Sequence, residues 1–324
     1  MSNSPVAIGI DVGGTKSLAM LVDRDGTILQ ELRSSSENDD TRGPGESMTD
    51  LLARQILEIC ETNNLVPADT PVGIGLPGLV RRDGTLAYAA NLQSASGADF
   101  PALLRAKAGV TSVEMENDGN AAALAEHAWG AGRGVENFAA ITLGTGIGGG
   151  IIANGELIRG RNGFGGEVGH MIVRAGGLRC ACGREGCWER YASGTGLGVL
   201  AATAAQEGRL PELSARLGAA NVRAEDVTAA AADGLEEAKA LLREVAWWLA
   251  IGLSNLVEIF DIGHFVIGGG LSNAAGEILP VANAELVSLV MAGDMYLPFT
   301  VEPAALGSNA GALGAALVGM RRGA

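Results

Sequence analysis

The sequence predicts an α/β protein of two domains that share a cleft. The chain has 324 residues, which is long enough for two domains of ordinary size. Its residues are 47% hydrophobic, so a sizeable core can form. A strand that enters a glycine and threonine turn and leaves as a second strand occurs twice, in residues 6–22 and again in 138–153. One such unit in each domain is the simplest interpretation of this duplication.

The overall charge limits the classes of molecule that the protein is expected to bind. The formal net charge is −14, which argues against nucleic acid because nucleic-acid-binding surfaces are basic. A small anionic ligand remains compatible with this charge, since backbone N–H groups and a metal can hold it locally. The first residues lack a basic region, and no apolar run approaches the ~20 residues of a membrane span. We therefore expect a cytoplasmic protein with reduced thiols and no membrane partner.

The first repeated unit is a strand, a glycine turn and a hairpin. Residues 6–10 are predicted to form a buried strand that ends in the turn DVGGTK at 11–16. A second strand at 18–22, a hairpin turn at 23–26 and a third strand at 27–32 follow. A P-loop or a dinucleotide fold would require a helix after the glycines. The turn is therefore of a different kind.

Strands and helices alternate after this unit. The predicted elements are a helix with Met48, Leu51, Leu52, Ile56 and Ile59 on one face, a strand at 72–76, a helix at 100–108, a strand at 113–116 and a helix at 120–129. Asn117 and Asp118 stand where the last strand enters the last helix. The helix N-terminus would keep Asp118 ionised and directed outward. The alternative is that Asp118 is only the N-cap of the helix.

The second unit repeats the first around residues 144–150. A strand at 138–143 enters this turn, and a strand with an Asn154-Gly155 hairpin turn leaves it. The glycines match a dinucleotide fingerprint formally, but a hairpin follows where a helix is required. A purely structural role remains open for either turn alone. Two such turns facing each other across a cleft would offer N–H groups to one polyphosphate.

The later part of the chain is mostly helical. The predicted elements are a helix at 235–258, a strand at 264–267, a helix near 277–291 and a small-residue helix at 306–320 that could pack closely. Trp247 and Trp248 in the first of these helices are expected in the core or at an interface between subunits.

Three of the four cysteines lie in one segment, GFGGEVGHMIVRAGGLRCACGREGCWE, at residues 163–189. The spacing is too tight for an unstrained disulfide. It suits tetrahedral zinc, and the predicted ligands are His170, Cys180, Cys182 and Cys187. The alternative is three reduced structural thiols, which is also the interpretation of Cys60 in its apolar helix. A structural zinc site has no need of carboxylates, so Glu167 and Glu189 indicate that the same loop presents polar groups to a ligand.

These motifs together resemble those of the ROK family of sugar kinases and regulators. The segments that carry the resemblance are DVGGTK (11–16), GLPG (75–78), ENDGNAAALAE (116–126), LGTGIGGG (143–150), GGEVGH (165–170), CACGREGCWE (180–189) and GGG (268–270). The resemblance covers nearly the whole chain and is greatest to the zinc-containing, ATP-dependent glucokinases of bacteria. It implies the actin-like ATPase (hexokinase-type) fold. Residues 1–118 and a C-terminal helix at about 306–324 would form a small domain, and residues 119–305 a large domain with the zinc loop.

The resemblance also implies roles for individual residues. Asp118 would be the catalytic base that accepts the proton of a sugar hydroxyl. The residues implied in sugar binding are Asn91, Asn117, Asp118, Glu167, His170 and Glu189. Those implied in nucleotide binding are Asp11, Gly13, Gly14, Thr15, Lys16, Gly144, Thr145, Gly146, Gly268, Gly269 and Gly270. Within this set Asp11 would help to position Mg²⁺, and the last three glycines would lie beside adenosine.

The implied activity is the phosphorylation of a hexose by MgATP, with D-glucose as the expected acceptor. Fructose, mannose, N-acetylglucosamine and N-acetylmannosamine are alternative acceptors, because the aromatic residue that the family has after Asn91-Leu92 is missing. Gly119 replaces the family's alanine and is expected to loosen the start of its helix. A sugar-responsive regulator is the other alternative, although no basic recognition helix precedes the first strand. A homodimer or a dimer of dimers is expected.

Overall fold

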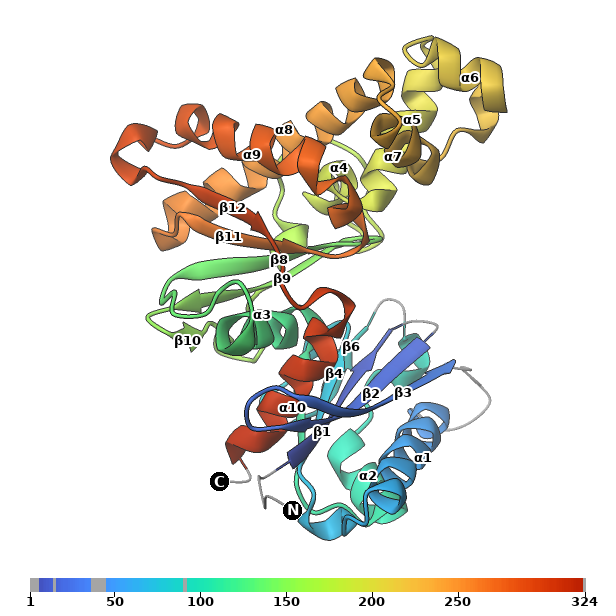
Figure 1. Ribbon diagram of the computed structural model, residues 1–324, viewed down its shortest axis with the longest axis vertical. Coiled ribbons are helices and arrows are strands. Elements are labelled where there is room, and N and C mark those ends of the chain that lie inside the picture. The colour runs from blue at the N-terminus through green and yellow to red at the C-terminus, as the bar shows by residue number, and fades with distance from the viewer. Residues whose placement is uncertain (1–5, 14–15, 36–44, 90–91, 323–324) are drawn as a thin grey trace.

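Two five-stranded sheets with the same strand order form the framework of the protein. The computed structural model describes residues 6–13, 16–35, 45–89 and 92–322 (Figure 1). The first sheet has the order β3-β2-β1-β4-β7, and its strands are β1 Val6–Val12, β2 Lys16–Asp23, β3 Ile28–Ser35, β4 Val72–Leu76 and β7 Val113–Asn117. The second has the order β10-β9-β8-β11-β12, and its strands are β8 Phe138–Leu143, β9 Ile147–Ala153, β10 Glu156–Leu157, β11 His264–Gly268 and β12 Thr300–Pro303.

The duplication extends beyond the hairpins that the sequence predicted. In each sheet an antiparallel three-stranded meander is followed by two parallel strands. Both predicted glycine turns join antiparallel strands, and the Asn154-Gly155 turn has positive φ angles at both residues, as a type I′ hairpin requires. Strand β11 pairs with β8 and β12 with β11, in the way that β4 pairs with β1 and β7 with β4. The predicted strand–turn–strand repeat is therefore part of a larger repeat that comprises all five strands of each sheet.

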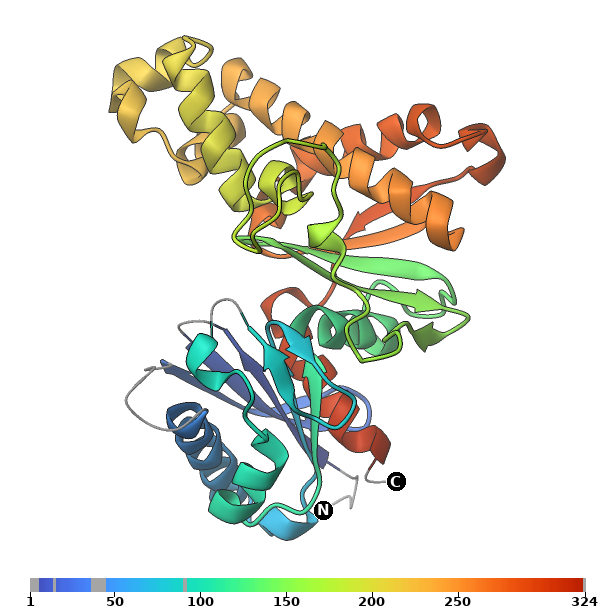
Figure 2. The same ribbon diagram turned by 180° about the vertical axis from the view of Figure 1, so that it is seen from behind.

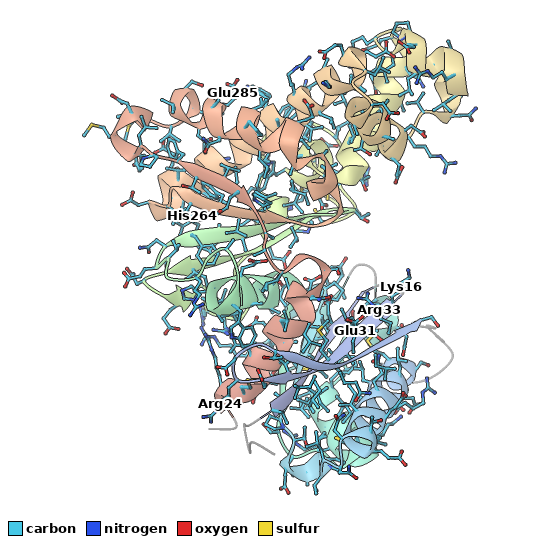
Figure 3. The ribbon with its side chains drawn as sticks, viewed as in Figure 1. Lys16, Arg24, Glu31, Arg33, His264 and Glu285 are labelled. Carbon is cyan, nitrogen blue, oxygen red and sulfur yellow. The ribbon has the colours of Figure 1, made fainter. Side chains whose placement is uncertain are left out.

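Helices cover both sheets (Figure 1). Those that pack with the first sheet are α1 Glu46–Thr62, α2 Phe100–Ala108, α3 Asp118–Trp129 and α10 Ala310–Arg322. Those that belong to the second half are α4 Glu189–Ala192, α5 Gly194–Gln206, α6 Pro211–Leu217, α7 Ala224–Ala232, α8 Glu236–Phe260 and α9 Ala275–Leu289. The predicted helix boundaries shift by a few residues. Helices α4–α7 were not predicted, because α4 and α6 are short and the small residues of α5 and α7 show little apolar periodicity. Figure 3 shows Glu285 on the side of α9 that faces away from the sheet.

Helices α3 and α10 lie between the two sheets and touch their neighbours through backbone atoms (Figure 1). A Cβ atom on Gly9 of β1 would lie 2.0 Å from the Ala312 carbonyl oxygen, and one on Gly73 of β4 would lie 1.8 Å from that of Ala315. The buried carboxylate of Glu126 in α3 also accepts the backbone N–H of Leu306, at 2.9 Å, just before α10. The predicted close packing of the terminal helix is thus confirmed.

Helix α8 is, within the described ranges, the one helix whose length and composition would suffice to cross a membrane. In the fold, 61% of its apolar window is buried, against α9 and the core of the second half. It is therefore the core helix of this half, while Trp247 on it remains 41% exposed.

Trp188 anchors the cysteine segment to α8. Its side chain is fully buried, and its Nε1 donates a hydrogen bond to the Trp248 carbonyl oxygen at 2.8 Å. The indole lies against Gly252, where a Cβ atom would come within 1.9 Å of the ring. Only glycine leaves room for this contact.

We predict that Gly252→Ala destabilises the protein although alanine favours helices. Overpacking against the indole should cost about 1–3 kcal/mol or more, which exceeds the gain in helix propensity of up to ~1 kcal/mol. The matched control is Gly276→Ala in α9, which is exposed and has no neighbouring atom within 4 Å of its added Cβ. Thermal unfolding followed by circular dichroism should show a lower midpoint for the first variant alone. Equal midpoints would contradict the packing argument.

Candidate active site

Two carboxylates meet at the carboxyl ends of two parallel strands, β1 and β7, that flank β4. Asp11 belongs to β1, and Asp118 is the first residue of α3, directly after β7. Gly75 of β4 stands between them, since its added Cβ would lie 3.7 Å from both Asp11 Oδ1 and Asp118 Cα. The absence of a side chain at Gly75 lets the two acids face the same space. Gly311 near the start of α10 packs against Asp11 in the same way.

Burial changes the ionisation of both acids. The pKa of Asp118 is raised by burial, although the Gly119 N–H, which donates to its Oδ1 at 2.8 Å, opposes this shift. Burial, and then the negative charge of Asp118, raise the pKa of Asp11 to about 7. Two buried carboxylates at one place favour a bound cation, and oxygen ligands suit Mg²⁺. The donor set therefore fits the expected metal.

Asn117, and not Asp118, is the N-cap of α3. The Asn117 Oδ1 accepts the backbone N–H of Asn120 at 3.0 Å, so the interpretation of Asp118 as a cap is wrong. The Asn117 Nδ2 donates to the Gly78 carbonyl oxygen at 3.1 Å. Both polar atoms of its amide are thus engaged within the chain, and one N–H and one lone pair of the oxygen remain for a ligand.

The expectation that Gly119 loosens the start of α3 is also wrong. A Cβ atom on Gly119 would lie 2.5 Å from the backbone nitrogen of Gly149 in β9. The first turn of α3 therefore rests directly on the second sheet. The glycine permits this contact and fixes the helix start close to the glycine turn of residues 144–150.

The zinc ligands predicted from the sequence converge. The Nδ1 or Nε2 atom of His170 and the Sγ atoms of Cys180, Cys182 and Cys187 all lie within 4.8 Å of one another. Zinc–sulfur bonds of ~2.3 Å in a tetrahedron place sulfur atoms about 3.8 Å apart. The Cys182 and Cys187 sulfur atoms are 3.6 Å apart, and His170 Nδ1 lies 3.9 Å from Cys180 Sγ. The four side chains fit a zinc ion, and the four cysteines of the chain are free.

The neighbours of Cys182 favour the thiolate form of its side chain. Burial alone would raise the pKa of Cys182, but hydrogen bonds from Arg184 and the other thiols lower it to about 6. The thiolate is the form that binds metal. Cys60, by contrast, is buried in α1 as expected for a core residue.

His170 lies between the cysteines and Glu167, and Glu189 lies on the cysteine side of its ring. Its Nδ1 lies on the cysteine side and 3.7 Å from Glu189 Oε1, and its Nε2 lies 3.8 Å from Glu167 Oε2. Burial raises the pKa of Glu167, although the charge of His170 opposes the shift. One ring nitrogen can thus bind metal while the other faces a ligand. Figure 2 shows this segment, between β10 and α4, rising across the second sheet.

A cavity of about 600 Å³ opens beside His170. Its lining residues are Pro77, Gly78, Leu79, Tyr88, Glu167, His170, Met171, Cys182 and Arg184. We call it the sugar pocket. Leu79 belongs to β5 (Leu79–Val80) and Tyr88 to β6 (Leu86–Tyr88), a separate two-stranded sheet. The sequence did not single out Tyr88 or Arg184, because an isolated tyrosine or arginine carries no pattern.

A second cavity, of about 870 Å³, lies at the other glycine turn. Gly144, Thr145 and Gly270 line it, together with Thr195 of α5, Thr228 of α7 and Arg223, which directly precedes α7. We call it the nucleotide pocket. The last three residues were missed, because neither helix was predicted. Gly269 does not line this cavity: with φ +89°, it packs on Leu143 at the end of β8.

One contact joins the elements beside the two pockets, although neither of its residues lines a pocket. A Cβ atom on Gly146 would lie 2.4 Å from Glu189 Oε2, so this carboxylate rests on the glycine turn. Glu189 also accepts a hydrogen bond from the Cys180 thiol at 2.9 Å. The turn and the cysteine loop therefore hold each other in position.

The first glycine turn is described in part. Gly13 N–H donates to the Lys16 carbonyl oxygen at 2.8 Å, whereas Gly14, Thr15 and Asn91 lie outside the described residues. The Lys16 side chain is exposed and lines neither pocket. Figure 3 places Lys16 at the end of β2 nearest the second half of the molecule. Gly268 lines neither pocket.

Two sheets of the same strand order, two acids around one space and a cluster of His170 with three cysteines define the class of protein. The model of the ROK family matches residues 7–321, so the chain belongs to the ROK family. A glucokinase of Streptomyces coelicolor is 36% identical over 96% of each chain. A kanosamine kinase of Amycolatopsis mediterranei is 33% identical over 98% of this chain and 97% of its own. The crystal structure of a ROK glucokinase from Streptomyces griseus with glucose and AMPPNP has a TM-score of 0.82 and 34% identity, and covers 98% of this chain and 99% of its own. The fold is accordingly the actin-like ATPase fold.

We predict that the purified protein carries about one zinc ion per chain and that Cys182→Ser releases it. Loss of one thiolate should weaken the site and free the loop that holds Glu167 and His170. Elemental analysis should find well under one zinc in this variant. Cys60→Ala is the matched control, because its thiol lies far from the cluster, and it should retain the metal. Wild-type protein without zinc would contradict the assignment.

Proposed function

We propose that the chain is a hexose kinase that transfers the γ-phosphoryl group of ATP to the 6-hydroxyl of D-glucose. The observation that carries this proposal is the contact between Gly146 and Glu189, which joins the glycine turn beside the nucleotide pocket to the cysteine loop beside the sugar pocket. A glucokinase relative and a neighbouring structure with glucose and AMPPNP support it. Phosphoryl transfer needs chiefly the positioning of two substrates in line, and adjoining pockets provide this.

Asp118 acts as the general base in this mechanism. Its carboxylate stands at the N-terminus of α3, beside the space that Asp11 also faces. The ionised form accepts the proton of the sugar hydroxyl as the bond to phosphorus forms. Backbone N–H groups of the glycine turns would hold the phosphates, and Asp11 would hold the magnesium that accompanies ATP. Magnesium supplies charge neutralisation on the phosphate oxygens.

The sugar is held by groups on the cysteine loop. Glu167 and His170 face the sugar pocket, and Glu189 lies beside His170. We infer that these three side chains bind sugar hydroxyls and that zinc maintains their geometry from behind. The remaining N–H of Asn117 and the side chain of Asn91 complete the proposed set. The kanosamine kinase relative makes an amino sugar the alternative acceptor.

The organisation around the site is also part of the proposal. We assign residues 1–118 and the C-terminal helix to a small domain, and residues 119–305 to a large one, each with its own sheet. The free cysteines agree with a cytoplasmic location. The half-exposed Trp247 on α8 suggests contact with a second copy, and light scattering showing a monomer at micromolar concentration would argue against it.

We predict that Asp118→Asn folds and binds glucose but loses turnover. Loss of a general base lowers kcat roughly 10²–10⁴-fold. Because burial raises the pKa of Asp118, the wild-type kcat/KM should fall as the pH decreases through a value above the ordinary aspartate range. The control is Asp83→Asn, an exposed turn residue that should leave turnover unchanged. Turnover of Asp118→Asn at the wild-type rate would exclude the base assignment.

We predict that kcat/KM with MgATP is higher for glucose than for mannose, fructose, N-acetylglucosamine, N-acetylmannosamine or glucosamine. A site that hydrogen-bonds each hydroxyl discriminates strongly against analogues that leave its polar groups unpaired. A coupled assay across these sugars tests this. A higher value for another sugar would change the acceptor and keep the kinase, whereas no turnover of any sugar would reject the kinase.

A further inference from the structure

A third cavity lies behind the sugar pocket, at the junction of the two halves. Its volume is about 330 Å³, within the range of small-molecule sites. Four of its lining residues are arginines: Arg81, Arg82, Arg159 and Arg321. We call it the arginine pocket. No part of the proposed reaction uses it.

We propose that the arginine pocket binds a phosphate dianion, either free or as a phosphate monoester, and that its occupancy alters sugar binding. The chain as a whole carries a net charge of −14, so four arginines in one cavity depart from the character of the molecule. Guanidinium groups are the side chains best suited to phosphate, because their N–H groups match its oxygens in pairs.

The carboxylates in the cavity leave part of this positive charge free. Three glutamates also line it: Glu114, Glu116 and Glu156. Glu116 is 5% exposed and is already paired, through its Oε2 at 2.7 Å, with Nε of Arg159. Arg82 donates from Nη2 to the Gly160 carbonyl oxygen at 2.6 Å, which occupies one of its five N–H groups.

Arg81 and Arg321 are the arginines whose N–H groups remain available to a ligand. In the described part of the chain, neither guanidinium forms a hydrogen bond or an ion pair. Partial burial, and then the positive charge of Arg159, lower the pKa of Arg321. Glu156 offsets part of the repulsion between Arg321 and Arg159, and a dianion beside Arg321 would relieve the rest.

The arginine pocket and the sugar pocket share their walls. On β5, Leu79 lines the sugar pocket and the next residue, Val80, lines the arginine pocket, because successive residues of a strand point to opposite faces. On the segment after β10, Arg159 lines the arginine pocket, and Glu167 lines the sugar pocket. One layer of backbone separates the two cavities.

The shared walls are held together by contacts across the two halves. A Cβ atom on Gly163 would lie 2.6 Å from the Val80 carbonyl oxygen, so the segment after β10 rests on β5. The Glu116 Oε1 accepts the backbone N–H of Asn117 and the Nδ2 of Asn120, both at 3.1 Å. An anion that draws Arg159 away from Glu116 would therefore disturb the start of α3, where Asp118 stands.

Calorimetric titration tests the binding site without relying on the kinase. Wild-type protein is saturated with AMPPNP and Mg²⁺, which fills the glycine turns, and is titrated separately with inorganic phosphate and with glycerol 3-phosphate. We expect at least one of them to bind at one site per chain. In the Arg81→Gln/Arg321→Gln double variant its affinity should fall at least tenfold. The matched control is Arg243→Gln on α8, outside the cavity, which should bind as the wild type does.

The two probes distinguish free phosphate from a phosphate monoester as the occupant. If neither binds the wild type at least tenfold more tightly than the double variant, the site is refuted, whatever the enzyme phosphorylates. The effect on sugar rests on the proposed function and is read separately, from the Kd of glucose with and without the bound probe. Coupling is reciprocal, so that Kd should shift in the wild type and stay constant in the double variant. An unchanged Kd in the wild type would refute the coupling.

Discussion

The active site depends on the close approach of backbones between the two sheets. Helix α10 lies on β1 and β4 without intervening side chains, because glycines at positions 9 and 73 leave room for its carbonyl groups. Helix α3 packs in the same way on β9 through Gly119. These contacts place the ends of β1 and β7, and so Asp11 and Asp118, around a single space. Larger side chains at these glycines would push the helices outward and separate the two acids.

The cysteine segment meets several requirements with few residues. Its indole at Trp188 is buried against α8, and its thiols and His170 surround one point. The next residue after Trp188 is Glu189, which rests on the glycine turn of the nucleotide pocket. The residues for core packing, for metal binding and for ligand contacts therefore stand next to one another in the sequence. A metal bound in this loop would influence the geometry of a substrate without taking part in the chemistry.

The two halves of the molecule meet through charged as well as apolar contacts. The Arg159–Glu116 pair and the hydrogen bond from Arg82 to Gly160 both cross the junction. A buried ion pair contributes little net stability, but it is costly to break and it favours one arrangement over others. Such pairs at the junction can hold the back wall of the sugar pocket in one position.

Much of this protein could be predicted from local sequence. The two glycine hairpins follow from turn chemistry and apolar strands, and the zinc ligands follow from the spacing of rare residues in one segment. Asp118 was identified as the possible base because the strand before it and the helix after it are both evident from their patterns. These features depend on neighbours in the chain, where sequence distance and spatial distance nearly coincide.

Only the tertiary structure decided the remaining features. Asn117 and Asp118 are both capable caps, and the hydrogen bond to Asn120 assigns this role to Asn117. Helices α5 and α7 line the nucleotide pocket. They bury mainly small residues against distant segments, so their sequences show little apolar periodicity. The contact of Gly146 with Glu189 and the convergence of four arginines join residues far apart in the chain. Such contacts arise when two sheets and the helices between them pack together. The pattern of residues in a short stretch of sequence does not predict that packing.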